Sequence, residues 1–212
     1  MKTDELIEAL VEDRARLRLS PRAGILWAAV GGAVIAALIF MAALGYRPDI
    51  AQAAGTFRFL FKFVFTLTLA ASALALVLQV FRPEVDLGRR LWLIAVAPAM
   101  LLAAVLAELF VMPSASWMPR LVGTNARYCL TWIPLLSLPP LLAFFAVLRR
   151  GAPADAGLAG ALAGLAAAGM GATLYASHCF DDSPLFVVTW YSLAIALVTL
   201  AGYLAGRRWL RW

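Results

Sequence analysis

Residues 24–44, GILWAAVGGAVIAALIFMAAL, decide the fold of this chain, because they form an apolar stretch of 21 residues without a charged side chain. A helix needs about 20 mostly apolar residues to cross a lipid bilayer. Five further stretches of this kind follow along the chain, at residues 59–81, 91–112, 129–148, 156–176 and 186–205. We therefore predict an all-α integral membrane protein in which residues 24–205 form six transmembrane helices.

The composition excludes a soluble globular protein. Of the 212 residues, 64% are hydrophobic and 14% are charged, and the mean hydropathy is +0.87. A soluble domain has about 25% charged residues, which cover its surface in water. The net charge of +6 does not indicate direct binding of nucleic acid, because basic residues of membrane proteins collect in cytoplasmic loops. We also expect no cleavable signal peptide, since residues 1–22 are polar and residues 24–44 are longer than the apolar region of a signal peptide.

The distribution of lysine and arginine predicts the orientation in the membrane. Thirteen of them lie in the two tails and two of the loops, at residues 1–23, 82–90, 149–155 and 206–212. Only five lie on the other side, and two of these, Arg58 and Lys62, begin the second span, where we expect them to reach toward the interface. Positively charged loops stay in the cytoplasm, so both termini are predicted to be cytoplasmic. The predicted outward loops are residues 45–58, 113–128 and 177–185.

The only two cysteines, Cys129 and Cys179, are predicted to lie on the same outward face. Cys129 begins the fourth span, and Cys179 lies in the loop between the fifth and sixth spans. Three interpretations stay open: a structural disulfide between two outer segments, a redox or metal switch, and two free buried thiols.

Other potential metal ligands lie near these cysteines or in the neighbouring span. Thiolate and imidazole suit Cu(I) and Zn, and an ionisable residue within a span usually faces a cavity or a partner. The candidate ligand set is His178, Cys179, Cys129, Asp181, Asp182 and Glu108. Its spacing is not that of a known metal motif, and the segment Asp181–Pro184 could simply start a helix. We expect no required cofactor; copper or zinc would act as a signal.

The N-terminal tail is predicted to form a short amphipathic helix over residues 3–18. Its first half is acidic, so an anionic inner leaflet would repel it, and a helix this short is marginal alone. These properties suit a segment that orders in the groove of a protein partner, although a solvated, frayed tail is the alternative. The candidate partner-binding residues are Thr3, Asp4, Glu5, Leu6, Ile7, Glu8, Leu10 and Val11.

The spans carry little that indicates an enzyme or a transporter. They contain no paired carboxylates and no Cys-x-x-Cys pair, and the chain has no phosphate-binding loop. A proton-coupled transporter usually needs more ionisable groups in its spans. The pattern Gly160-Ala-Leu-Ala-Gly164 in the fifth span allows close helix approach, and we expect it to serve packing within the chain rather than a dimer interface.

Three segments resemble the NrsF family of bacterial membrane anti-sigma factors, the negative regulators of sigma F. They are Met1–Leu10, Asn125–Leu130 and, most specifically, His178–Tyr191, which reads HCFDDSPLFVVTWY. The resemblance covers essentially the whole chain, including the six-span layout. It implies a protein that sequesters an extracytoplasmic-function sigma factor at the inner membrane. It further implies that the cytoplasmic segment at about residues 3–13 holds the sigma factor, and that Cys129 and Cys179 are needed for its release under metal or oxidative stress.

Our hypothesis is therefore an inner-membrane anti-sigma sensor with membrane lipids and a sigma factor as partners. The alternative from a different class is a membrane thiol oxidoreductase or metal-handling protein that uses the same two cysteines. A transporter or channel is a third interpretation, for which the sequence supplies few polar residues within the spans.

Overall fold

The computed structural model describes residues 20–80, 88–151 and 153–210. Its elements in chain order are α2 (Pro21–Ala43), α3 (Ile50–Ala53), α4 (Phe57–Val80), η1 (Gly88–Leu91), α5 (Trp92–Val111), η2 (Ser114–Ser116), α6 (Trp117–Val122), α7 (Ala126–Leu148), α8 (Ala156–Ala176), α9 (Pro184–Phe186), the π-helix η3 (Val187–Tyr191) and α10 (Ser192–Trp209). Within these residues there is no β-strand, and six helices are long and apolar enough to cross a membrane. The predicted fold class is confirmed. The predicted tail helix and its partner-binding residues, Thr3 to Val11, lie outside the described residues.

Local signals fix where the helices begin. Helix α2 starts three residues before the predicted span, because Ser20 accepts a hydrogen bond from the amide of Ala23 and Pro21 takes the first helical position. Helix α7 begins at Ala126, three residues before the predicted span, so that Cys129 lies in its first turn. The last span is one continuous helical run from Pro184 to Trp209 that includes the π-helical turn.

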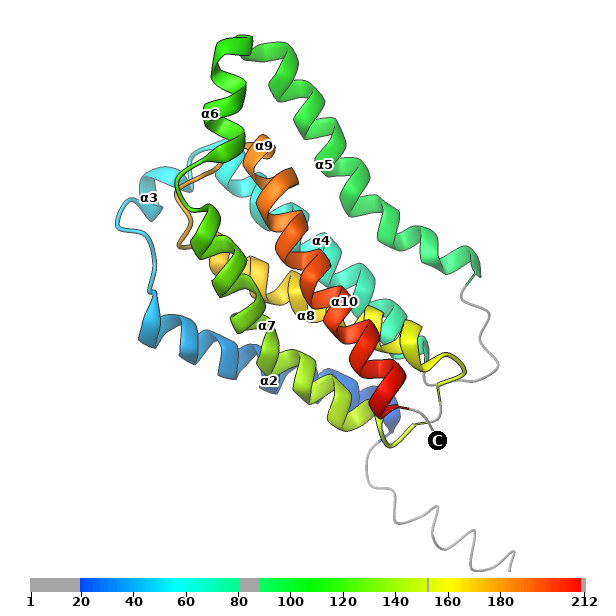
Figure 1. Ribbon diagram of the computed structural model, residues 1–212. Coiled ribbons are helices and arrows are strands. Elements are labelled where there is room, and N and C mark those ends of the chain that lie inside the picture. The colour runs from blue at the N-terminus through cyan, green and yellow to red at the C-terminus, as the bar shows by residue number, and fades with distance from the viewer. Residues whose placement is uncertain (1–19, 81–87, 152, 211–212) are drawn as a thin grey trace, which may run out of the picture.

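Helix α8 is the centre of the bundle and packs against α10, α4 and α7 (Figure 1). In the most apolar stretch of α8, 67% of the residues are buried, which is the largest share among the six spans. Its small residues allow this burial: a Cβ atom at Gly160 would lie 2.2 Å from the carbonyl oxygen of Gly202, and one at Gly206 would lie 2.3 Å from that of Ala156. The GxxxG pattern of α8 therefore meets the glycines of α10 within the chain, as we expected.

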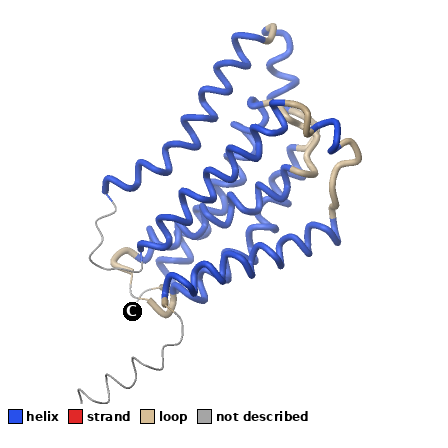
Figure 2. Tube along the Cα trace, turned by 180° about the vertical axis from the view of Figure 1, so that it is seen from behind, coloured by secondary structure: helices blue, strands red, loops and turns tan. Residues whose placement is uncertain are grey.

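Helix α5 is the peripheral span. Figures 1 and 2 show it leaning away from the other spans, and it packs mainly against α4. Only three of its residues are buried, Ala97, Leu101 and Glu108.

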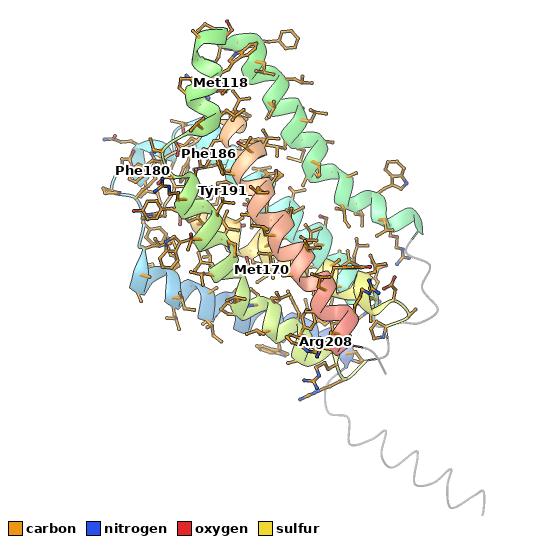
Figure 3. The ribbon with its side chains drawn as sticks, viewed as in Figure 1. Met118, Met170, Phe180, Phe186, Tyr191 and Arg208 are labelled. Carbon is orange, nitrogen blue, oxygen red and sulfur yellow. The ribbon has the colours of Figure 1, made fainter. Side chains whose placement is uncertain are left out.

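The two ends of the bundle differ in chemistry. Figure 3 shows Phe180, Phe186 and Tyr191 toward one end and Arg208 at the other. The first end collects the loop between α8 and α9 and the starts of α4 and α7, and it contains the polar cluster described next.

Candidate functional site

The site forms where the loop of residues 177–183 folds back over the ends of α4 and α7. Helix α8 ends when the amides of His178 and Cys179 both donate to the carbonyl of Tyr175, at 3.0 Å each. The next helix starts at Pro184, and Ser183 caps it by accepting a hydrogen bond from the amide of Leu185. The helix-start interpretation of this segment is thus correct for Ser183 and Pro184, which leaves the two aspartates free for other contacts.

Both cysteines are buried free thiols with no exposed surface. The sulfur of Cys179 lies 3.7 Å from the carbonyl oxygen of Asp181, to which it donates, and Cys129 lies within electrostatic range of Cys179. Burial raises the pKa of the Cys179 thiol, and this outweighs the opposing influence of the nearby Lys62 ammonium. Cys179 is therefore a neutral thiol at neutral pH, and neutral thiols react slowly.

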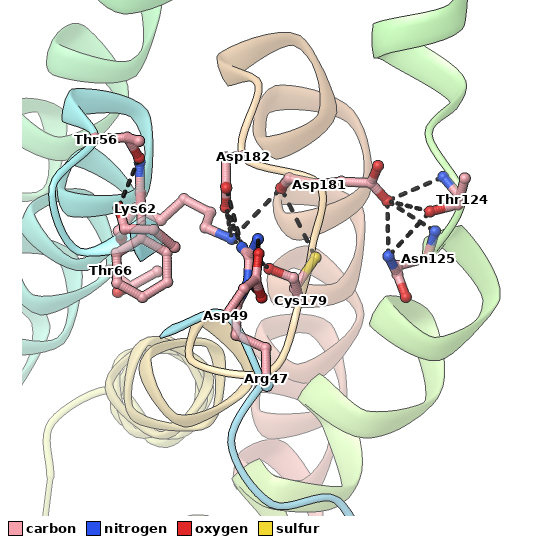
Figure 4. A network of polar contacts seen from close by, with 12 residues as sticks. Arg47, Asp49, Thr56, Lys62, Thr66, Thr124, Asn125, Cys179, Asp181 and Asp182 are labelled. Carbon is pink, nitrogen blue, oxygen red and sulfur yellow. Dashed lines mark hydrogen bonds and ion pairs between the residues drawn. The ribbon is translucent and has the colours of Figure 1, made fainter. Parts of the chain in front are cut away.

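The backbone of Cys179 is held by two cations (Figure 4). Its carbonyl oxygen accepts from Lys62 Nζ at 2.9 Å and from an Arg47 guanidinium nitrogen at 3.1 Å. Both cations also pair with Asp182, at 2.6 Å from Lys62 and 3.0 Å from Arg47. We call Arg47, Lys62 and Asp182 the loop clamp.

Lys62 corrects an expectation, because its side chain does not reach toward water. It has no exposed surface, and its ammonium points into the loop that carries Cys179. A buried charge is retained only when it is paired and hydrogen-bonded, and Asp182 with the carbonyl of Cys179 meets that need.

Arg47 is held in turn by Asp49 and Phe180. Its guanidinium donates to both carboxylate oxygens of Asp49, at 2.7 and 2.8 Å, and lies 4.7 Å from the centre of the Phe180 ring. The hydrogen bond from Arg47 lowers the pKa of Asp49, and the same contact raises the pKa of Arg47. In the sequence, Arg47 contributed only as one of the charges that predict orientation; its short spacing to Asp49 in a predicted outward loop was the signal that could have shown more.

Asp181 joins the loop to the helix that carries the other cysteine. One of its oxygens accepts from the backbone amides of Thr124 and Asn125, at 2.9 and 2.8 Å, and from the Asn125 side chain at 3.0 Å. These amides lie at the N-terminus of α7, where a carboxylate is stabilised by the helix dipole. Cys129 lies in the first turn of that helix, so Asp181 ties the two cysteine-bearing segments together.

Glu108 faces partners within the chain, as expected for an ionisable residue in a span. It is 6% exposed and accepts from Arg58 and Arg120 at 3.0 Å each and from Ser183 at 3.2 Å. These contacts pin the end of α5 to α4 and to the start of α9.

The six candidate metal ligands are divided among separate contacts. His178 Nδ1 lies 3.0 Å from the carbonyl oxygen of Gly45, while the three carboxylates have the partners given above. Within the described residues, no group of three or more His, Cys, Asp or Glu side chains could hold a metal ion. The structure places Cys129 and Cys179 near enough to influence each other electrostatically and does not gather the other four around them as one ligand set.

Two tyrosines that the sequence analysis did not select lie beside these thiols. Tyr175 ends the last turn of α8, and Tyr191 ends the π-helix. Both are fully buried, and their ring centres are 6.0 Å apart. Tyr191 closes the segment of strongest family resemblance, which was the signal available in the sequence.

Comparison with known proteins gives a consistent result. The family model described as "Negative regulator of sigma F" matches residues 10–212. The chain is 37% identical over 216 aligned positions to the "Anti-sigma-F factor NrsF" of Caulobacter vibrioides (strain NA1000 / CB15N), and the alignment covers 100% of both chains. It is 31% identical, again over 100% of both chains, to the "Probable anti-sigma-F factor NrsF" of Azospira oryzae (strain ATCC BAA-33 / DSM 13638 / PS). No solved structure matches the chain.

Proposed function

The chain belongs to the NrsF family, the negative regulators of sigma F, and we propose that it holds an extracytoplasmic-function sigma factor at the bacterial inner membrane until its outer cysteines receive a signal. The observation that carries this proposal is the loop clamp. In this clamp, Lys62 of α4 donates to the backbone carbonyl of Cys179, and α4 is long enough to cross a membrane.

The arrangement of the arginines supports the proposed orientation. Arg22, Arg149, Arg150, Arg207 and Arg208 lie at or near the ends of α2, α7 and α10, which meet at one end of the bundle (Figure 1). Clustering of basic residues on one side is typical of the cytoplasmic face. The site with both cysteines then faces the periplasm, and residues 3–13 are on the side where a sigma factor is present.

The chemistry of the site suits a soft metal ion as the signal, and an oxidant is the other signal that the sequence led us to expect. Structural zinc takes four ligands in a tetrahedral arrangement, and no group of three or more suitable side chains forms among the described residues. Two buried thiols suit a soft ion such as Cu(I) better. Of the two metals expected from the sequence, copper is therefore our choice.

Release would follow from displacement of Cys179. A signal that moves this residue disturbs its carbonyl contacts with Lys62 and Arg47, and so disturbs α4 and the loop at 45–49 together. The coupling between the two faces need only be about 1–3 kcal/mol. Residues 3–13, with help from the loops at 82–90 and 149–155, are the proposed contact with the sigma factor.

The test is a pull-down from detergent-solubilised native membranes. Full-length protein is compared with a variant lacking residues 2–13 and with a variant in which the same twelve residues are scrambled, which keeps length and charge but breaks the apolar stripe. We expect a sigma factor with the full-length protein only. Equal recovery with the scrambled tail would contradict the proposed contact.

The cysteine part of the proposal needs its own variant. Cys179→Ser is expected to keep the sigma factor bound after exposure to Cu(I) or peroxide, under conditions that release it from the wild-type protein. Normal release from Cys179→Ser under every inducing stress would rule out the switch.

A further inference from the structure

The two buried tyrosine hydroxyls, of Tyr175 and Tyr191, make no well-formed hydrogen bond, although both approach the side chain of Cys179. They are the only buried side-chain nitrogen or oxygen atoms in the described part of the chain without such a bond. Both residues have no exposed surface. A buried polar group without a partner destabilises a protein, so its presence calls for an explanation such as a bound species or a functional role.

The surroundings of these hydroxyls indicate which role. The electrostatic neighbours of both phenols are the thiols of Cys179 and Cys129. Tyr191 is placed by the π-helical turn Val187–Tyr191, a feature that is frequent at functional sites. Two buried thiols and two buried hydroxyl donors are therefore neighbours at this end of the bundle.

Binding of a soft monovalent cation would change the charge in this space. When Cys129 and Cys179 bind one Cu(I), both S–H bonds break, two S–Cu bonds form and two protons leave to solvent. The resulting bis-thiolate complex carries a single negative charge. A buried charge of this kind is costly unless hydrogen bonds reach it, and hydrogen bonds to an ionised acceptor are the strong ones.

The nearby cation cannot supply these hydrogen bonds without giving up others. Lys62 Nζ already donates to the carbonyl of Cys179 and pairs with Asp182. The two phenols approach the Cys179 thiol without a well-formed hydrogen bond to any group, so their donors are available. We propose that Tyr175 and Tyr191 donate hydrogen bonds to the sulfur atoms of Cys129 and Cys179 when a soft cation replaces the thiol protons. This inference rests on the proposed function and gives the signal site two positioning residues.

The test uses full-length protein in detergent, with Cu(I) as the probe in competition against a chromophoric Cu(I) chelator. Tyr175→Phe and Tyr191→Phe are expected to lower the Cu(I) affinity by roughly 10–100-fold, the usual effect of losing a hydrogen bond to a metal ligand. Tyr128→Phe is the matched control, because Tyr128 adjoins Cys129 in the sequence but is 58% exposed. Its affinity should equal that of the wild type.

A second measurement separates this role from a structural one. Because each Tyr→Phe change removes an unsatisfied buried hydroxyl, the Tm of the metal-free protein should stay equal or rise while the Cu(I) affinity falls. A lower Tm with unchanged affinity would show that the hydroxyls bond a buried water, and would overturn the inference.

The same titration on Cys179→Ser distinguishes the two proposals. If Cys179→Ser loses Cu(I) binding and both Tyr→Phe variants bind like the wild type, the inference fails and the proposed site stands. If Cys179→Ser binds like the wild type, the site itself is wrong. If the wild type binds no Cu(I), the inference and the copper signal both fall, while the sigma-release assay still tests the cysteines.

Discussion

Lys62 shows most directly how one residue can connect the loop that carries Cys179 to a helix. A lysine with no exposed surface persists because Asp182 and the carbonyl of Cys179 surround its ammonium. The side chain comes from α4, whereas its partners come from the loop after α8. The loop carrying Cys179 is thus attached to a helix more than a hundred residues away in sequence.

Lys62→Met removes that attachment while keeping the length of the side chain. Breaking one side of a buried ion pair costs about 3–5 kcal/mol, and we expect the lower end, about 3 kcal/mol, because Arg47 still pairs with Asp182. Thermal unfolding in detergent measures the loss, and faster maleimide labelling of Cys179 reports the loosened loop. Arg58→Met is the matched control at the start of the same helix: its partner Glu108 keeps Arg120, so the cost should stay below about 1 kcal/mol.

The contact between Asp49 and Arg47 predicts that the stability of the protein depends on pH in the acid range. The pKa of Asp49 is lowered in the folded state by the hydrogen bond from Arg47, so its contribution to stability is present above the unfolded pKa of about 3.9. That contribution is lost as the pH falls through the lower, folded pKa. In Asp49→Asn it is missing at every pH. The difference in Tm between wild type and variant should therefore be largest above about pH 5 and shrink on acidification, and a difference that stays constant would contradict the role of this contact.

The sequence could identify residues of the site whose side chains are rare in membrane spans, but it could not predict the contacts that these residues make. The two cysteines and Glu108 stood out in the sequence because such groups are unusual in or beside apolar spans. Lys62, Arg47 and the two tyrosines were missed, since their role depends on which helix ends meet, and the sequence gives no distance between residues 47, 62 and 182.

At the scale of elements, the pairing of α8 with α10 holds the bundle together through glycine. A Cβ atom at residue 160 would lie 2.2 Å from the carbonyl oxygen of Gly202 and would clash with it. This oxygen belongs to the backbone of the facing helix. Nothing can move aside there except the helix itself. This differs from a crowded side chain, which can change rotamer.

Gly160→Ala is accordingly expected to destabilise the protein by about 3 kcal/mol, at the upper end of the cost of overpacking. In a chain of this size the Tm should fall by roughly 6–12 °C. Gly31→Ala on α2 is the control, because a Cβ atom there meets nothing within 4 Å. The control should be neutral or gain up to about 1 kcal/mol of helix propensity. Equal losses in both variants would show that helix contact at residue 160 is not the cause.

The length of the apolar stretches predicted the six spans, but it did not predict which span is central in the bundle and which is peripheral. All six spans are apolar enough to cross a membrane, and because lipid and protein interior are both apolar, this property alone does not show which span is central. Only the small residues of residues 156–176 hinted that this helix is central. The lean of α5 away from the bundle depends on its few buried contacts, and no sequence pattern indicated it.

At the scale of the whole molecule, the end that carries the two cysteines and the arginine-rich end are connected by helices that run the length of the bundle. The loop clamp touches α4 through Lys62, and Asp181 touches the start of α7. Both helices continue to the opposite end, where Val80 and Leu148 end them. A change at the clamp can therefore reach the opposite end along two continuous helices, and a measurement at both ends tests that coupling.

Asp182→Asn provides that measurement, since it keeps the shape of the side chain and removes the charge that both Lys62 and Arg47 pair with. We expect the variant to release its sigma factor without any signal, and the amount recovered in a pull-down should fall about 5–150-fold, the range of a coupling of 1–3 kcal/mol. Arg120→Gln is the control, because it weakens an ionic contact at the same end that does not involve Cys179 and leaves Glu108 paired with Arg58. If Arg120→Gln also released the sigma factor, general loss of stability would explain the effect. If Asp182→Asn exposed Cys179 to labelling yet kept its sigma factor, the clamp would hold the loop without transmitting the signal. The contact of Asp181 with the start of α7 would then be the next one to remove by mutation.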